Sequence, residues 1–303
     1  LKVLVALGGS TNAIVHMMAI ARRAGVALTM EDLQKASDAI PLLVDCKPSG
    51  AVYMEDFHNS GGLPGLLKVL EPVLDPTPIN IQGSSVTERL AEVTFPGDWQ
   101  TVIRPMEAPL GPKGSLTTLS GTLAPDGAII KTSAASPELF EHEGPAVVFD
   151  SPEDVALRLD DPETQITPDS IMVLRNAGPI AAGMPEAGSL PIPRTLAVQG
   201  IKDMVRVSDA RMSGTAYGTV VLHCAPEAAA GGPLALVRDG DHIRLSISER
   251  RIDLLVDEAE LADRRKAFVA PPLPSRGWAR LYSKHVLQAN EGADMDFMVE
   301  GET

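Results

Sequence analysis

The sequence predicts an α/β protein in which the remnant of an α/β domain is followed by a β-barrel-like, mixed α/β domain. Residues 1–70 alternate an apolar run with helical periods, which is typical of an α/β layer. Residues 83–131 are rich in Pro, Gly, Thr and Ser, as expected at a boundary, and many short β-rich runs follow them. We therefore expect one domain over residues 1–110, including a linker, and a β-rich domain over residues 111–303.

The first domain is expected to contain one strand and several helices. Leu1–Leu7 is an apolar run that predicts a buried strand. It begins without a Met or a polar lead-in, so we expect a fragment cut within a domain. Helices are predicted over residues 13–24, over residues 29–39 with Thr29 and Asp32 as a weak capping box, and after Gly61-Gly-Leu-Pro64.

The second domain is expected to consist mostly of short strands. Helical periods interrupt them at Ser151–Leu159 and Glu258–Phe268. The predicted strands are Ala146–Phe149, Ile171–Leu174, Met204–Val207, Thr219–Leu222, Leu234–Val237, Ile243–Ile247 and Ile252–Val256.

Composition and charge exclude several functional classes. The 303 residues include 26 basic and 40 acidic side chains, a net charge of −14, which argues against nucleic acid or an anionic membrane as a partner. No apolar run approaches the roughly 20 residues that span a bilayer, so the cytoplasm is the expected location. An anionic substrate would need local positive charge or a metal.

The two cysteines indicate neither a disulfide framework nor a structural zinc site. Cys46 and Cys224 lie far apart and neither belongs to a CxxC pair. His223 is adjacent to Cys224, but neighbouring residues of a strand point to opposite faces, so we expect no Cys–His nucleophile.

Two loops carry the groups best suited to chemistry. Gly183-Met-Pro-Glu186 and Arg206–Thr215 each follow or include the end of a predicted strand and then break into Gly and Pro. Loops held by a rigid scaffold are where catalytic residues concentrate. A third motif, Gly8-Gly-Ser-Thr-Asn12, is expected to pack near this site and shape it; it lacks the Lys and further Gly of nucleotide-binding loops.

These blocks resemble the dihydroxy-acid and sugar-acid dehydratase family. The resemblance also includes Lys47-Pro-Ser-Gly50, Met54-Glu-Asp-Phe57 and Leu123-Ala-Pro-Asp-Gly127, in family order along the chain. It implies a hydro-lyase that uses an iron–sulfur cluster, [2Fe–2S] in preference to [4Fe–4S], and Mg²⁺. It also implies a homo-oligomeric parent protein, a dimer or tetramer.

The resemblance assigns a role to each candidate site residue. Ser213 matches the serine base, Thr215 can present a second hydroxyl near the substrate, and Glu186 matches a Mg²⁺ ligand. Mg²⁺ prefers carboxylate oxygen, and Glu186 follows a constrained Gly-Met-Pro backbone. A serine works as base only if nearby cations stabilise its alkoxide, and Arg211 is a candidate for that task. The alternatives, if the resemblance is set aside, are that Glu186 is an exposed loop residue, that Ser213 caps a turn and that Thr215 lies at a strand edge.

The resemblance begins at about the middle of the family's length. The family's cluster cysteines, and an Asp-Lys pair that supplies further Mg²⁺ ligands, would lie in the half that precedes Leu1, so we expect these residues alone to be inactive. The spelling Ser208-Asp-Ala-Arg-Met-Ser-Gly-Thr215 favours the sugar-acid branch and an aldonate substrate. Dihydroxy-acid dehydratase of branched-chain amino-acid biosynthesis and a non-catalytic binding or regulatory domain are the alternatives.

Overall fold

The chain divides into two compact units. The computed structural model describes residues 1–186, 190–212 and 217–299. One unit comprises residues 1–9 and 33–116, and the other comprises residues 10–32 and 117–303. None of the helices in the described residues is long and apolar enough to cross a membrane. A domain boundary at residue 110 stays a prediction.

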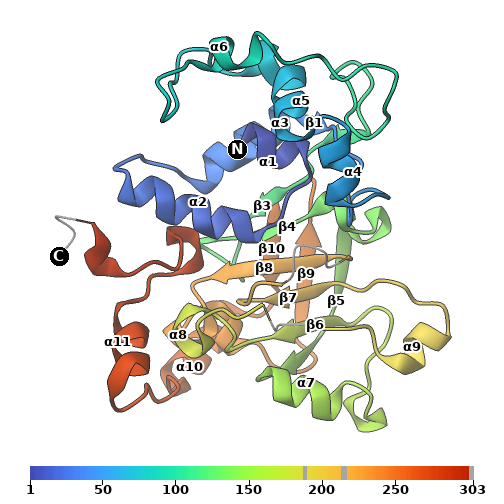
Figure 1. Ribbon diagram of the computed structural model, residues 1–303. Helices are drawn as coiled ribbons and strands as arrows, with labels where there is room; N and C mark the ends of the chain where they lie inside the picture. Colours follow the sequence, from blue (N-terminus) through green and yellow to red (C-terminus); the bar gives the residue numbers. More distant parts are fainter. Residues whose placement is uncertain (187–189, 213–216, 300–303) are drawn as a thin grey trace. The chain divides into compact units, whose positions relative to one another are not determined.

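The first unit is mainly helical. Its elements are α1 (Lys2–Ala6), β1 (Pro41–Leu42), α4 (Met54–Asn59), α5 (Gly62–Leu70), α6 (Val86–Leu90) and β2 (Gly111–Lys113), and it also takes in most of α3 (Met30–Ala39). β1 and β2 form a small antiparallel pair. The helices predicted over residues 29–39 and after Pro64 are confirmed as α3 and α5 (Figure 1).

The strand predicted over Leu1–Leu7 is wrong, because this run forms the helix α1. Only Val5 and Ala6 of this helix are buried, so one side of it meets the core. A short apolar run does not distinguish a buried strand from a buried helical turn. The hydroxyl of Ser115 donates to the carbonyl oxygen of Val5, 2.6 Å away, and holds the helix from its buried side.

The second unit is built on an eight-stranded mixed sheet, whose order is β10-β9-β5-β6-β7-β8-β4-β3. β5 to β8 are parallel neighbours, and the other pairs are antiparallel. The strands are β3 (Thr117–Leu119), β4 (Gly127–Ile130), β5 (Glu141–Phe149), β6 (Ile171–Leu174), β7 (Arg206–Ser208), β8 (Val220–Ala225), β9 (His242–Ser246) and β10 (Arg251–Leu254).

The two edges of this sheet come together, so the sheet is a nearly closed barrel. Ser120, directly after β3, pairs with Arg251 of β10. Its amide N–H donates to the carbonyl of Arg250, and its own carbonyl accepts from the amide of Ile252, each at 3.0 Å. Closure removes unpaired strand edges. The expected β-barrel-like, mixed α/β fold is therefore confirmed.

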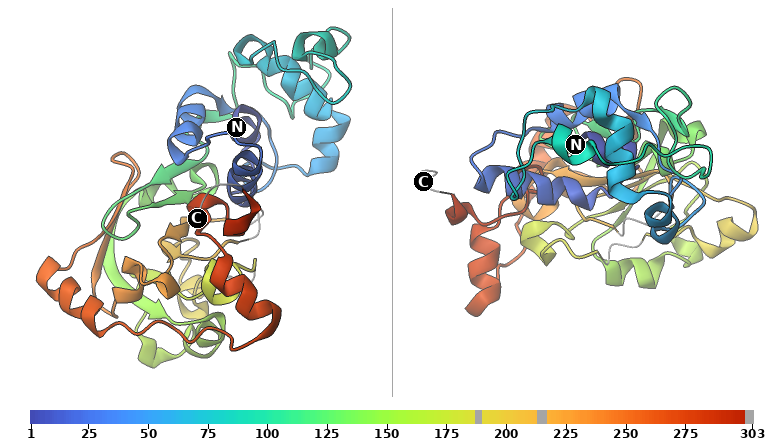
Figure 2. Two further views of the ribbon diagram at one scale, coloured as in Figure 1. Left: turned by 90° about the vertical axis from the view of Figure 1, so that its left-hand side faces the viewer. Right: turned by 45° about the horizontal axis from the view of Figure 1, so that its top comes forward.

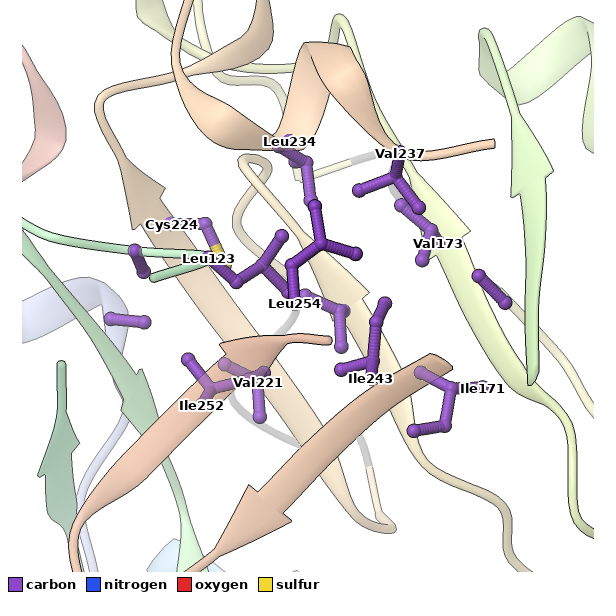
Figure 3. Close-up of a cluster of buried hydrophobic side chains, with 14 of the residues drawn as sticks. Leu123, Ile171, Val173, Val221, Cys224, Leu234, Val237, Ile243, Ile252 and Leu254 are labelled. Carbon is purple, nitrogen blue, oxygen red and sulfur yellow. The ribbon is translucent and has the colours of Figure 1, made fainter. Parts of the chain in front are cut away.

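Apolar side chains from most of the strands fill the barrel interior. Figure 3 shows Leu123, Val221 and Leu254 gathered in one cluster, with Cys224 among them. The segment predicted as a strand over Leu234–Val237 also contributes to the cluster, but it forms the 3₁₀ helix Pro233–Leu236. Pro233 lacks an amide donor and suits the first position of a helix, which explains the wrong prediction.

The helices in the described part of this unit are α2 (Asn12–Arg23), α7 (Pro152–Arg158), α8 (Pro179–Ala182), α9 (Arg194–Val198), α10 (Glu258–Ala267) and α11 (Gly277–His285). The helices predicted over residues 13–24, 151–159 and 258–268 are confirmed as α2, α7 and α10. α2 lies beside the late segment around Ala289, although the two are far apart in sequence (Figure 2).

Candidate active site

The site lies at the carboxyl ends of two neighbouring parallel strands. β6 ends at Leu174 and leads to the turn that bears Glu186, whereas β7 ends at Ser208 and leads to Arg211. The carboxyl ends of parallel strands meet at one edge of a sheet, where α/β folds commonly bind ligands. The two loops do meet, because Nε of Arg211 donates to the carbonyl oxygen of Met184 at 2.6 Å.

Two consecutive left-handed residues shape the turn before Glu186. Gly183 has φ +71° at the end of α8, and Met184 has φ +53°. Glycine suits such a position, but a long side chain there is strained and must be held by its surroundings. Met184 is buried and packs with Val15 of α2 and with Ala289.

Asn12, the first residue of α2, contacts Glu186 directly. Its Nδ2 donates to Oε1 of the carboxylate. Its Oδ1 is buried and has no hydrogen-bond partner within the described residues. The Gly8–Asn12 motif was expected to pack near the candidate site, and its last residue does contact Glu186. The pairing itself, across 174 positions, had no signal in the sequence beyond that motif.

The buried carboxylate of Glu227 holds the segment before Glu186 through hydrogen bonds to the backbone of α8. Both oxygens of Glu227 accept backbone N–H groups at the start of α8, from Ile180 at 2.7 Å and Ala181 at 3.1 Å. Gln288 donates to the same carboxylate at 3.1 Å. Burial raises the pKa of Glu227 above its ordinary value, against these hydrogen bonds. The first turn of α8 is thereby fixed to the barrel.

Asp209 anchors the beginning of the same loop. It is fully buried and accepts the backbone N–H groups of Asn176, Ala177 and Ala228 at 3.0 to 3.2 Å. Burial raises the pKa of Asp209 to about 6, although the three hydrogen bonds favour the charged form. Asp209 and Glu227 together hold the segment between β6 and α8 through hydrogen bonds to its backbone.

The sequence-predicted residues are only partly covered by the structure. Glu186 lies at the site described above, beside Asn12. Ser213 and Thr215 lie outside the described residues, so their roles stay predictions. Arg206, at the start of the second loop motif, pairs with Asp203 at 2.8 Å in a buried position and so has a structural use.

The cysteines do not form a metal site. Both are free and buried, Cys46 in one unit and Cys224 in the other. Burial raises the pKa of each thiol, which disfavours the thiolate that a metal requires. Among the described residues, no group of three or more His, Cys, Asp or Glu side chains is placed to hold a metal ion.

Comparison with known proteins places these features in a family. Residues 101–293 match the model described as dihydroxy-acid/6-phosphogluconate dehydratase, C-terminal, and residues 1–89 match its N-terminal counterpart. The chain is 48% identical, over 99% of its length, to the 6-deoxy-6-sulfo-D-gluconate dehydratase of Pseudomonas putida. It is 48% identical, over 97% of its length, to the L-arabonate dehydratase of Azospirillum brasilense.

A relative with a different substrate in its name is also similar. The chain is 41% identical, over 97% of its length, to the dihydroxy-acid dehydratase of Leifsonia xyli subsp. xyli. The chain spans about half the length of these curated relatives, 52% of each. Family profiles cover most of the chain, and the matched segments include every motif quoted above. The chain therefore belongs to the dihydroxy-acid/6-phosphogluconate dehydratase family.

Proposed function

We propose that this chain is part of a sugar-acid dehydratase, which converts an aldonate to a 2-keto-3-deoxy acid. The reaction removes the C2 proton and expels the C3 hydroxyl as water; the resulting enol becomes the 2-keto acid. The observation that carries the proposal is the juxtaposition of Glu186 with Asn12 at the strand ends that precede the predicted base, Ser213.

The choice of substrate class rests on the relatives. Two relatives named for sugar acids are 48% identical to the chain, compared with 41% for the dihydroxy-acid dehydratase described above. The motif Ser208–Thr215 favours the same branch. The dihydroxy acid of branched-chain amino-acid biosynthesis is the second candidate, because its reaction has the same chemistry.

The residues at the site fit a magnesium ion. Mg²⁺ takes oxygen ligands and is often bound by one or two carboxylates together with water and substrate oxygens. The Glu186 carboxylate would be one ligand, and the buried, unpartnered Oδ1 of Asn12 is a second oxygen of suitable chemistry. When bound, the ion would supply positive charge for the acid end of the substrate. Asn12 orients the carboxylate, and Arg211 adds a guanidinium to an otherwise acidic chain.

The residues of this chain do not fit an iron–sulfur cluster. Such clusters require several thiolates, and the two thiols present are buried in different units. A cluster in the full-length protein would need cysteines outside these 303 residues. We propose for the same reason that the 303 residues alone dehydrate no aldonate.

Two substitutions in the full-length protein test the proposal, and the two variants should lose activity for different reasons. Ser213→Ala should lower kcat for L-arabinonate by at least roughly 10²-fold, the lower range of what a positioned base contributes, without changing Mg²⁺ binding. Glu186→Gln should weaken Mg²⁺ binding, because a neutral oxygen replaces an anionic one, and high Mg²⁺ should restore part of the rate.

Thr29→Ala serves as the control, because among the described residues the hydrogen bonds of Thr29 stay within its own exposed capping box. It should change neither quantity. Near-normal turnover of Ser213→Ala on every aldonate and dihydroxy acid would show that the base lies elsewhere. A wild-type protein that binds these acids but converts none of them would favour the non-catalytic alternative.

A further inference from the structure

Arg206 holds several segments of the second unit with one guanidinium. The side chain is buried and pairs with Asp203, and its Nε donates to the carbonyl oxygen of Met204. Nη1 donates to the carbonyl oxygen of Leu190 at 3.2 Å, and Nη2 donates to that of Tyr217, also at 3.2 Å. Neutralising a buried charge would need only Asp203, so the contacts with the two distant carbonyls require another explanation.

These two carbonyl oxygens belong to the last residues of the loops that bear the predicted site residues. The first loop, residues 184–190, carries Glu186, and the second loop, residues 211–217, carries Ser213. Arg206 therefore binds the last residue of each loop. Residues four positions apart are separated by at most roughly 14 Å in an extended chain, so fixing the end of a loop restricts where its other residues can lie.

The beginnings of the same two loops are joined by a second arginine. Arg211 is the first residue of the second loop, and its Nε donates at 2.6 Å to the carbonyl oxygen of Met184, the first residue of the first loop. The loops are thus linked at their starts through Arg211 and at their ends through Arg206. Two loops joined at both ends have less freedom to separate than two loops joined at one end.

Gly218, directly after the second loop, lets the chain approach the guanidinium closely. Its φ is +117°, which residues with a side chain rarely adopt. A Cβ atom at this position would overlap Nη2 of Arg206 and crowd Oδ1 of Asp203. The amide of Gly218 donates to the carbonyl oxygen of Ala134 at 2.8 Å, just after β4, which holds this segment in place. A side chain at Gly218 would therefore displace the guanidinium from the second loop.

A guanidinium suits this task and an ammonium does not. The planar group carries donors that point in fixed and different directions, so it can bind a carboxylate and carbonyl oxygens of separate segments at once. A lysine ammonium has all three donors on one atom. It can neutralise Asp203, but one atom cannot take the places of both Nη atoms of Arg206.

We propose that Arg206 is a positioning residue for catalysis: by binding the ends of both loops, it sets the spacing between Glu186 and the predicted base, Ser213. Arg206 acts through the two loops and not on the substrate itself. This inference rests on the proposed function, in which the Mg²⁺ ligand and the base act on one substrate molecule. The rate depends on such spacing, because a displacement of about 1 Å can lower it by roughly 10²-fold.

The test uses Arg206→Lys in the full-length protein. This variant keeps a positive charge beside Asp203 but loses the carbonyl contact with at least one loop. At saturating Mg²⁺, its kcat for L-arabinonate should fall at least roughly 10-fold, with a smaller change in KM, because the groups that bind the acid remain. Circular dichroism checks that the variant is folded at the assay temperature. Hydrogen–deuterium exchange should become faster in peptides from residues 184–190 and 211–217.

Arg264→Lys is the matched control. The side chains of Arg264 and Arg206 are equally buried, each with 9% exposure. Arg264 likewise pairs with an aspartate, Asp241, and donates to a backbone carbonyl, that of Leu236, at 2.9 Å. Neither partner belongs to the two loops. This variant should lose a similar amount of thermal stability but should change neither kcat nor the exchange of the two loops.

Gly218→Ala disturbs the same contact from the side of the second loop, because the added methyl group would displace the guanidinium. It should reproduce the loss of kcat and the faster exchange of residues 211–217. Gly240→Ala is its control. Gly240 has φ +85°, and no described atom lies within 4 Å of an added Cβ, so this variant introduces backbone strain alone and should keep kcat.

Three results would overturn the inference. One is a normal kcat in folded Arg206→Lys. Another is exchange that becomes faster throughout the second unit, since this would reduce the effect to a general loss of stability. The third is an equal loss of kcat in Arg264→Lys.

Failure of the proposed function gives a different result. If the wild type converts only dihydroxy acids, the sugar-acid proposal fails, but kcat of the same variants on that substrate still tests Arg206. A wild type that converts neither acid removes the proposed function and this inference with it, whereas the exchange data would still show whether Arg206 joins the two loops.

Discussion

Buried polar groups have different partners at the start and at the end of the neighbouring strands β7 and β8. Before β7, Asp203 pairs with Arg206 at 2.8 Å and accepts the N–H and hydroxyl of Thr219. Burial disfavours the charged form of Asp203, but the Thr219 hydrogen bonds and the Arg206 charge outweigh it and lower its pKa. After β7 and within β8, Asp209 has no cationic partner in its hydrogen-bonding set, and Nε2 of His223 has no partner among the described residues.

We interpret this difference as one between a structural end of the barrel and the end that carries the candidate site. The buried charges Asp203 and Arg206 neutralise each other at the first end, whereas at the second end Asp209 is held by backbone N–H groups alone and Nε2 of His223 has no partner among the described residues. Proteins tolerate such violations mainly at functional sites, where they are compensated elsewhere. In this family member, the unsatisfied end is also the one that carries the loop to Glu186.

The largest expected effect comes from breaking the structural end. Arg206→Met leaves Asp203 charged and buried, so the free energy of unfolding should fall by about 3–5 kcal/mol. Urea unfolding measures it. Arg194→Met is the control, because the Arg194–Asp160 pair is largely exposed and should contribute less than about 1 kcal/mol. Equal effects of the two variants would remove the contrast between the ends.

Lys131 is the exception at the structural end. It directly follows β4 and is buried, and burial alone lowers its pKa to about 8. Because the unfolded chain then binds more protons, the charged form destabilises the fold below pH 8, and this penalty disappears as the pH rises from about 8 to 10.5. Lys131→Met should therefore raise stability at pH 7 by about 1–3 kcal/mol, with no gain at pH 10.5.

The measurement for Lys131 is urea unfolding at both pH values. A variant that gains no stability at pH 7 and binds L-arabinonate more weakly in the full-length protein would place Lys131 with the functional groups. The division of the barrel into a structural and a functional end would then have to be redrawn, with Lys131 at the functional end.

The smallest expected effect concerns Asp209. Its folded pKa, about 6, lies above the ordinary value of 3.8, so the folded state holds its proton more tightly. The stability from this group is present below pH 4 and is lost as the pH rises to about 6. Asp209→Asn cannot titrate, so the difference in stability between wild type and variant should shrink by on the order of 1–2 kcal/mol between pH 4 and 7. A constant difference would show that the carboxyl is not perturbed.

Regular elements were predictable because their causes are local. β6 was predicted at its observed bounds, since Ile171–Leu174 is an uninterrupted apolar run. α3 was predicted from its capping box, and Thr29 does bond with Asp32. Leu1–Leu7 was mistaken because length and flanks do not separate a short helix from a strand. α11 was not predicted, although Trp278, Leu281 and Tyr282 follow a helical spacing in its sequence; none of its residues is buried.

The candidate site was predictable in its position but not in its geometry. Strand ends followed by Gly and Pro predicted that Glu186 lies in a loop, and it does lie in the turn that follows β6 and α8. The same prediction for Ser213 falls outside the described residues. The Asn12 partner of Glu186 and the two loop carbonyls that Arg206 binds depend on tertiary packing. Neither leaves a local pattern that a single sequence reveals.

The ion pair between α2 and the late segment has a consequence for biosynthesis. Nε of Arg23 binds Asp294 at 2.7 Å, and 271 residues separate the two. At ribosomal rates of about 5–20 residues per second, α2 waits roughly 15–50 s for this partner. Val15, which packs with Ala289, is without that cover meanwhile. Asn12 opens the same helix, so the residue that contacts Glu186 belongs to an element that is completed only when the last residues of the chain have been made.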